Sequence, residues 1–333
     1  MAHGPDTEEL LRRIANATTQ LHISELTITS LPELPPGIQK LYCCRTQITS
    51  LPELPAGLQE LWCSETQLTS LPALPAGLQM FWCYNTPLTS LPALPAGLQS
   101  LSCWNTKITS LPDLPAGLQE LQCYGTHITT LPALPAGLQK LYCHGTHITY
   151  LPALPARLPR LYCSETQLTC LPELPAGLQE LYCPFTQLTS LPKLPPGLQR
   201  LVCHNTSLTS LPALPAGLRE LWCSCTQITG LPELPAGLLV LYCSHTNLTS
   251  LPELPDGLQK LECGNTPLLL QRIKGESIKD YNLRWDEWRS KKRSIERTKS
   301  LAEDLIAATW HPDRFEAWCL DEEEKKENEA LCA

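Results

Sequence analysis

The sequence predicts an α/β solenoid in which short parallel strands line one side, extended segments line the other, and a helix caps each end. A unit of about twenty residues recurs from about residue 21 to about residue 270, as in LQELWCSETQLTSLPALPAG at 58–77. Chains of such units stack into solenoids. Each unit has apolar residues at alternating positions, typical of a strand. Each also has Leu-Pro steps, which exclude a helix there and predict extended or polyproline-like backbone.

The consensus of the unit is L-x-x-L-x-C-x-x-T-x-L-T-x-L-P-x-L-P-x-G. Its first eleven positions match the pattern of leucine-rich repeats, with Cys at the third apolar site and Thr at the turn site. In that geometry Leu61 and Cys63 point into the solenoid. Glu60, Trp62 and Ser64 point outward onto the strand side, which we expect to be concave.

The stretch TSLPELPAGLQEL at 49–61 resembles the repeats of secreted bacterial leucine-rich-repeat effectors, in the short twenty-residue class with a doubled Leu-Pro step. The resemblance covers residues 21–270 and implies the fold. Many members of that family carry a large C-terminal ubiquitin-ligase domain with a catalytic Cys in a C-x-D motif, while the repeats recognise the substrate or restrain the ligase. Residues 319–321 read Cys-Leu-Asp, but the roughly sixty residues after the repeats are too few for such a domain.

We expect three regions: an N-terminal capping helix at 1–20, a solenoid of about thirteen units at 21–270, and a helical C-terminal cap with a charged tail at 271–333. The N-terminal helix is predicted from Asp6 or Thr7 as N-cap, acidic residues in the first turn, and Leu10, Leu11 and Ile14 on one face.

Two ladders of identical residues run through the units. Twelve units place a Cys at one position, from Cys43 to Cys263, and the opening unit has Ile23 there. An aliphatic residue at an equivalent site favours apolar packing of reduced thiols over a metal or redox site. The Thr at the turn site, from Thr46 to Thr266, is predicted to bond buried backbone groups. Cys44, Cys170 and Cys225 lie off the ladder and are expected to be the accessible thiols.

An aromatic stripe is predicted on the outward face, beside the Cys ladder. Its residues immediately precede the ladder Cys, or follow it in two units where the preceding position lacks an aromatic; Tyr84 also occupies this later position. They are Tyr42, Trp62, Trp82, Tyr84, Trp104, Tyr124, Tyr142, Tyr162, Tyr182, Trp222 and Tyr242. Two interpretations stay open: a protein-binding surface, since exposed aromatics mark interaction sites, or packing between neighbouring strands. Sequence variation at the next position, from Arg45 to His245, favours binding.

Composition excludes several partners. The formal charge is −8, and no basic patch runs through the repeats, so nucleic acid is not expected. No apolar stretch is long enough for a membrane span, and the N-terminus has no apolar signal region. With its Cys residues at a packing position, the protein is expected in a reducing compartment, the cytoplasm.

His127, His144 and His147 are predicted to lie close together on the surface. Because no nearby carboxylate or exposed Cys would complete a tetrahedral set of metal ligands, we predict no metal and no cofactor.

The tail has three interpretations. WHPDRFEAWCLDEEE at 310–324 resembles a short terminal motif in repeat proteins of large DNA viruses that infect protists, which implies a viral protein in the host cytoplasm. The tripeptide at 311–313 also matches J-domain co-chaperones, but the sequence that follows is too short and acidic for that domain. The preferred interpretation is a cap, with Ile295, Leu301, Leu305 and Ile306 at partly helical spacing.

These observations predict a non-enzymatic interaction module that binds a protein or peptide on the concave aromatic face. One alternative is a ubiquitin-ligase-like or adaptor activity of the tail, with Cys319 as nucleophile and Asp321 beside it. Another is a structural, self-assembling scaffold. The sequence does not decide the oligomeric state or name the partner.

Overall fold

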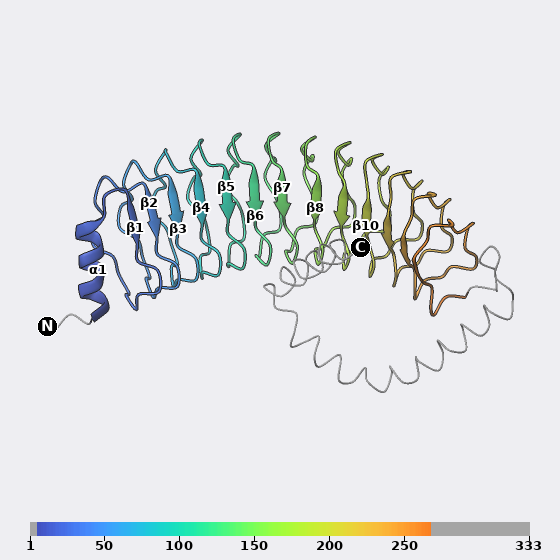
Figure 1. Ribbon diagram of the computed structural model, residues 1–333, viewed down its shortest axis with the longest axis horizontal. Coiled ribbons are helices and arrows are strands. Elements are labelled where there is room, and N and C mark those ends of the chain that lie inside the picture. Colours follow the sequence, from blue (N-terminus) through green and yellow to red (C-terminus); the bar gives the residue numbers. More distant parts are fainter. Residues whose placement is uncertain (1–4, 268–333) are drawn as a thin grey trace, which may run out of the picture. The chain divides into compact units, whose positions relative to one another are not determined.

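The protein is described by a computed structural model in which residues 5–267 are placed. Within them, one helix, α1 (Pro5–Asn16), precedes thirteen strands that pair in chain order into one parallel sheet (Figure 1). The strands are β1 (Gln20–His22), β2 (Lys40–Tyr42), β3 (Glu60–Trp62), β4 (Met80–Trp82), β5 (Ser100–Ser102), β6 (Glu120–Gln122), β7 (Lys140–Tyr142), β8 (Arg160–Tyr162), β9 (Glu180–Tyr182), β10 (Arg200–Val202), β11 (Glu220–Trp222), β12 (Val240–Tyr242) and β13 (Lys260–Glu262). The predicted solenoid of parallel strands is confirmed.

The strand register equals the repeat length. Leu41 of β2 lies opposite Leu61 of β3, and each further strand pairs in the same way with the strand twenty residues later. Equivalent positions of successive units therefore form straight columns across the sheet. A column is the natural unit for describing both the core and the surface.

The core consists of the inward columns. Leu61 and Cys63 are fully buried, as are their equivalents in most units. The ladder thiols are free, and burial raises the pKa of Cys103 and Cys143 to about 12, so they stay protonated at neutral pH. The Cys43 thiol lies 3.4 Å from the carbonyl oxygen of Trp62 in the next strand. These observations confirm packing as the role of the ladder.

The Thr ladder closes the turn after each strand. The Thr66 hydroxyl donates a hydrogen bond of 2.8 Å to the carbonyl oxygen of Cys63 in the same unit. The same bond recurs from Thr46 to Thr266. Because this carbonyl oxygen is buried, leaving it without a hydrogen-bond donor would lower the stability of the protein by on the order of 1–3 kcal/mol. The predicted backbone-satisfying role of the Thr column is confirmed.

The residue before each ladder Thr adopts a left-handed backbone. Its φ is 56° at Glu65 and 54° at Phe185, and its N–H donates to a carbonyl of the next unit, as from Arg45 to Ser64 at 3.0 Å. This conformation is sterically unfavourable for residues other than glycine. This column was predicted only to be variable. The signal for its left-handed backbone was Gly125, Gly145 and the recurrent Asn.

Phe185→Asn is expected to stabilise the protein by about 0.5–1 kcal/mol, because Asn tolerates positive φ better than a bulky aromatic. Asn already occupies this position at Asn85, Asn105 and Asn205. The measurement is the urea midpoint. Tyr150→Asn is the matched control, since Tyr150 is an exposed aromatic outside the left-handed column, and its midpoint should stay near that of the parent. A lower urea midpoint for Phe185→Asn would show that contacts of the Phe185 ring stabilise the protein by more than its left-handed backbone destabilises it.

The Leu-Pro side of each unit has neither helix nor strand in the described residues. A single turn interrupts the extended segment, closed by a bond from the Leu58 N–H to the Pro55 carbonyl at 3.0 Å. The predicted extended side is therefore confirmed, and its Leu side chains pack against the core, as Leu54 and Leu74 do.

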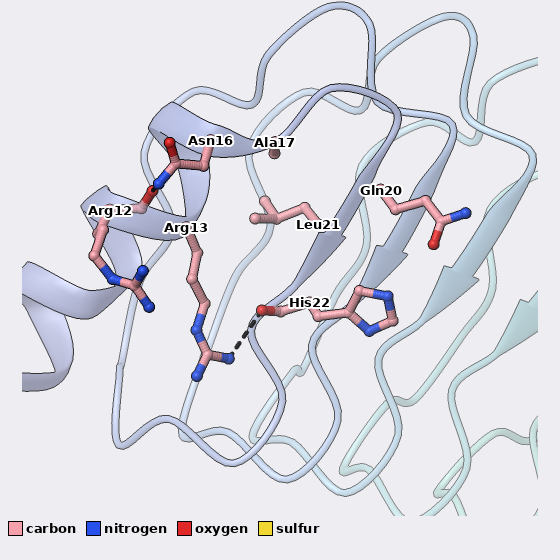
Figure 2. A pocket seen from close by; sticks show the side chains of 7 residues that line it. All are labelled: Arg12, Arg13, Asn16, Ala17, Gln20, Leu21 and His22. Atoms are coloured by element: carbon pink, nitrogen blue, oxygen red, sulfur yellow. Dashed lines mark hydrogen bonds between the residues drawn. The ribbon is translucent and has the colours of Figure 1, made fainter.

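Helix α1 lies at the N-terminal end of the sheet, beside β1 (Figure 1). Leu10 is 3% exposed and joins the core, and Ile14 packs against it. Leu11 was predicted on the same face, but it is exposed, because it is one residue out of step with the buried stripe. Arg13 donates a bond of 3.0 Å to the His22 carbonyl, as Figure 2 shows.

The predicted N-cap is wrong. The helix begins at Pro5, a residue suited to a first turn, so Asp6 lies inside the helix. The Asp6 carboxylate instead accepts hydrogen bonds from the Thr27 hydroxyl and from the Thr27 N–H, the latter at 2.8 Å, and these bonds lower its pKa. That the region 1–20 caps the solenoid stays a prediction. The C-terminal cap and charged tail predicted at 271–333 lie outside the described residues.

In the described part of the chain, no helix combines the length and the apolar composition needed to cross a membrane.

Candidate functional site

The outward face of the sheet has three columns. We call them the first, second and third columns, at the positions of Glu60, Trp62 and Ser64. Between these residues the side chains of Leu61 and Cys63 point into the core, because alternate residues of a strand face opposite sides. All eleven residues of the aromatic stripe lie in the second or third column.

The second column begins with a run of stacked rings. The ring centroids of His22 and Tyr42 are 4.2 Å apart, and those of Trp62 and Trp82 are also 4.2 Å apart with nearly parallel planes. Tyr42 meets Trp62 edge to face at 4.9 Å. The run ends after Trp82, because Ser102 and Gln122 follow in this column.

The third column continues the stripe across this interruption. Tyr84, Trp104, Tyr124 and His144 stack in succession, with centroid separations of 4.4, 5.0 and 4.4 Å. Trp104 is only 9% exposed. Tyr84 belongs to the same unit as Trp82, so the run passes from one column to the other without a missing unit.

Beside this run, on the same face, the second column holds a polar pair. The Ser102 hydroxyl donates to the Gln122 side-chain oxygen at 3.0 Å, and the Gln122 amide donates to Glu120 at 2.8 Å. The fold therefore accepts a small polar pair in place of two aromatics in this column.

The second column becomes aromatic again at β7. Tyr142, Tyr162 and Tyr182 stack with centroid separations of 5.0 and 4.7 Å. At β10 Val202 interrupts the column, and Trp222 and Tyr242 resume it with an edge contact at 4.7 Å.

The third column again supplies a ring where the second lacks one. His204 lies 5.3 Å from Phe185 and 6.5 Å from Trp222, measured between ring centroids. The aromatic surface thus extends over most of the described sheet, from β1 to β12.

Histidines of the second and third columns belong to this surface. His22 and His204 were not predicted in the stripe, and His144 was considered only as a metal ligand. Their signal was their position in the same two columns as the aromatics. Burial lowers the pKa of His144 to about 4 and also lowers that of His204, so both rings are neutral at physiological pH.

The stripe is packed and also presented to solvent. The large hydrophobic residues that count as exposed among the described residues are Leu11, Tyr150 and Phe185, with about half of their surface accessible, and all three lie outside the stripe. Burial raises the pKa of Tyr182 to about 12, and it also raises that of Tyr162, so these hydroxyls stay protonated at neutral pH. Ring stacking is what the packing interpretation expects; protein binding by these residues stays a prediction.

The three histidines considered as metal ligands do not come together as a group. His127 and His147 are neighbours, with Nδ1 and Nε2 3.5 Å apart, but His144 stacks on Tyr124. Among residues 5–267, no three His, Cys, Asp or Glu side chains are arranged to hold a metal ion.

The off-ladder thiols differ in access. Cys170 and Cys225 are exposed, as predicted. Cys44 is half-buried, and burial raises its pKa. Cys319 and Asp321, the viral-like terminal motif and the tripeptide at 311–313 lie outside the described residues.

Solved structures of leucine-rich bacterial proteins are similar to this chain. YopM from Yersinia enterocolitica WA-314 superposes with a TM-score of 0.73 at 34% sequence identity, covering 78% of this chain and 58% of that one. The leucine-rich effector YopM from Yersinia pestis superposes with a TM-score of 0.61 at 28% identity, covering 80% and 89%. Together with the twenty-residue strand register and the buried Leu columns, these matches identify the structural class of the chain. The chain is a leucine-rich-repeat protein.

This leucine-rich-repeat protein also shares its fold with the functional domain of InlJ from Listeria monocytogenes, which includes a cysteine ladder. That superposition has a TM-score of 0.56 at 22% identity, and it covers 74% of this chain and 68% of that one. The chain spans 58% of the length of the Y. enterocolitica protein. No family model and no curated protein matches the sequence.

Proposed function

We propose that this leucine-rich-repeat protein is a non-enzymatic interaction module whose aromatic stripe binds a protein or peptide. The observation that carries the proposal is the continuity of the stripe. Where the second column has Ser102 and Gln122, the third column supplies Trp104 and Tyr124, so an aromatic surface is kept although the residues that form it change.

The residue types also favour binding over internal packing alone. The indole N–H groups of Trp62, Trp82 and Trp222 are covered and have no acceptor among the described residues. Burying a donor without a partner costs free energy, which Phe at the same positions would avoid. Trp is, however, enriched in the binding hot spots of interfaces.

Two further points support the proposal. The similar Y. pestis protein is an effector, and the stripe offers apolar ring surface and protonated tyrosine hydroxyls, which suit contact with a protein. The proposed location is the cytoplasm, because exposed thiols such as Cys170 and Cys225 persist as thiols in a reducing compartment.

The test is affinity capture from a cell lysate with the intact chain and with the double variant Trp62→Ser, Trp82→Gln. This variant copies the Ser102–Gln122 pair that the fold already accepts in the same column, so the solenoid should stay intact. We expect at least one protein to be captured by the intact chain and lost by the variant, by roughly tenfold or more, as for removal of a hot spot.

Tyr150→Ala is the matched control, because it removes an exposed aromatic outside the stripe. It should capture the same protein as the intact chain. Circular dichroism and the urea midpoint verify that the variants fold. Equal capture by the intact chain and the double variant would contradict the proposal, and so would concentration-dependent self-assembly with no captured protein.

A further inference from the structure

Charged residues of the first column pair across neighbouring strands. Lys40 and Glu60 lie opposite each other, and so do Arg200 and Glu220; in both pairs the nitrogen and oxygen are 2.8 Å apart. The cationic side chains of these pairs are about one-third exposed, at 32% for Lys40 and 31% for Arg200. In these two pairs the opposite charges thus form close ion pairs.

Lys140 and Arg160 break this pattern. They are direct partners in the register of β7 and β8, and like charges opposite each other on adjacent strands are destabilising. Each forms an ion pair on its far side, Lys140 with Glu120 at 3.5 Å and Arg160 with Glu180 at 3.3 Å. These contacts are longer than those of the other two pairs, and the two cations are more exposed, at 57% and 50%.

Both cations line a cavity of about 250 Å³. It is lined by Gln139, Lys140, Leu141, Tyr142, Pro159, Arg160, Tyr162 and Gln179. The stacked rings of Tyr142 and Tyr162 belong to the aromatic stripe, so the cavity opens beside it. The lining thus combines two cations, tyrosine rings and the amides of two glutamines.

We propose that this cavity holds one carboxylate of an acidic residue in the protein that binds the stripe. The inference rests on the proposed function and deepens it by specifying the chemistry of the partner. A carboxylate between Lys140 and Arg160 would relieve their mutual repulsion, and an Arg guanidinium can bind a carboxylate through two parallel bonds. The adjoining tyrosine rings would contact the apolar neighbours of that acidic residue.

The flanking charges limit the size of the anion. Glu120 and Glu180 lie one strand further out on either side, and strands of a sheet are about 4.8 Å apart. A run of phosphates along the column would meet both carboxylates, which disfavours a nucleic acid. The site therefore suits a single carboxylate with uncharged neighbours, a pattern that a partner protein can present.

The experiment uses the full chain labelled with ¹⁵N and the probe peptide acetyl-Tyr-Leu-Glu-Leu-Tyr-amide. Chemical-shift titration follows the side-chain amides of Gln139 and Gln179. We expect the glutamate peptide to bind at least tenfold more tightly than its glutamine counterpart. We expect the Lys140→Gln, Arg160→Gln double variant to lose this preference.

Lys107→Gln with Lys193→Gln is the matched control, because it removes the same charge from exposed positions elsewhere and should keep the preference. Equal binding of the glutamate and glutamine peptides would overturn the proposal, and so would an unchanged preference in the Lys140 and Arg160 variant. A phosphoserine peptide that binds more than tenfold more tightly than the glutamate peptide would assign the cavity to phosphate instead.

The same double variant separates this inference from the proposed function. If a captured protein is lost by the Trp62 and Trp82 variant but fully kept by the Lys140 and Arg160 variant, the interaction module stands and the carboxylate site is overturned. If the glutamate peptide shows its preference while no protein depends on the stripe, the proposed function fails and the carboxylate-binding cavity itself stands.

Discussion

Replacing Phe81 with alanine is expected to lower the free energy of unfolding by about 3–5 kcal/mol, as for other buried aromatic residues. Phe81 is fully buried at the central position of β4, where the neighbouring strands carry Leu61 and Leu101. Its removal leaves a cavity between two repeats. In a solenoid each repeat depends on its neighbours, so the loss should weaken the coupling of the units on either side.

Phe81→Leu is the control, since it restores the residue found at this position in the other described strands. It should cost less than about 1.5 kcal/mol. Urea unfolding followed by circular dichroism gives the free energies, and hydrogen exchange should show the largest loss of protection in β3 to β5. A loss below about 1 kcal/mol for Phe81→Ala would show that the neighbouring repeats close the cavity.

Lowering the pH from 7 to 4 is expected to destabilise the protein through His144 by up to about 3 kcal/mol, since each pKa unit corresponds to about 1.4 kcal/mol. Burial against Tyr124 lowers the pKa of His144 from 6.5 to about 4. Between these values the unfolded chain binds a proton that the folded chain does not. The stabilising contribution is therefore complete above pH 6.5 and is lost as the pH falls toward 4.

His144→Tyr isolates this contribution, because tyrosine already stacks in the third column at Tyr84 and Tyr124 and does not titrate in this range. The measurement is the urea unfolding free energy of both proteins at pH 7.5, 6.5, 5.5 and 4.5. The stability of the parent should fall relative to that of the variant across this series. A constant difference would mean that His144 is protonated equally in the folded and unfolded states.

Much of the fold could be predicted from the repeat alone. Leu61, Cys63 and Thr66 recur at fixed spacing, and a strand reverses its side-chain direction at each residue, so the inward and outward columns follow directly. The Leu-Pro steps exclude a helix for a local reason, the restricted backbone of proline. The helix start was missed because Asp6 bonds to Thr27, a contact that joins residues distant in sequence.

The candidate site could be predicted only in part. The sequence located the eleven aromatic residues and both positions that they occupy, but not which rings stack. The structure shows two stacked runs, one ending at Trp82 and the next beginning at Tyr84 of the same unit. The left-handed column was missed for a different reason: Glu65, Phe185 and Cys225 are unfavourable there, and the conformation follows from the backbone bond to the next repeat.

By itself, the sequence determined the solenoid, its strands, its buried Leu, Cys and Thr columns and the face that carries the aromatic residues. These properties depend on local periodicity, which is repeated in every unit. Only the tertiary structure decided which rings stack, that His22, His144 and His204 join them, and that Lys140 and Arg160 line one cavity. Those features depend on how side chains of neighbouring repeats orient. Residues twenty apart in the sequence lie side by side on the sheet, so packing and charge between them decide the orientation.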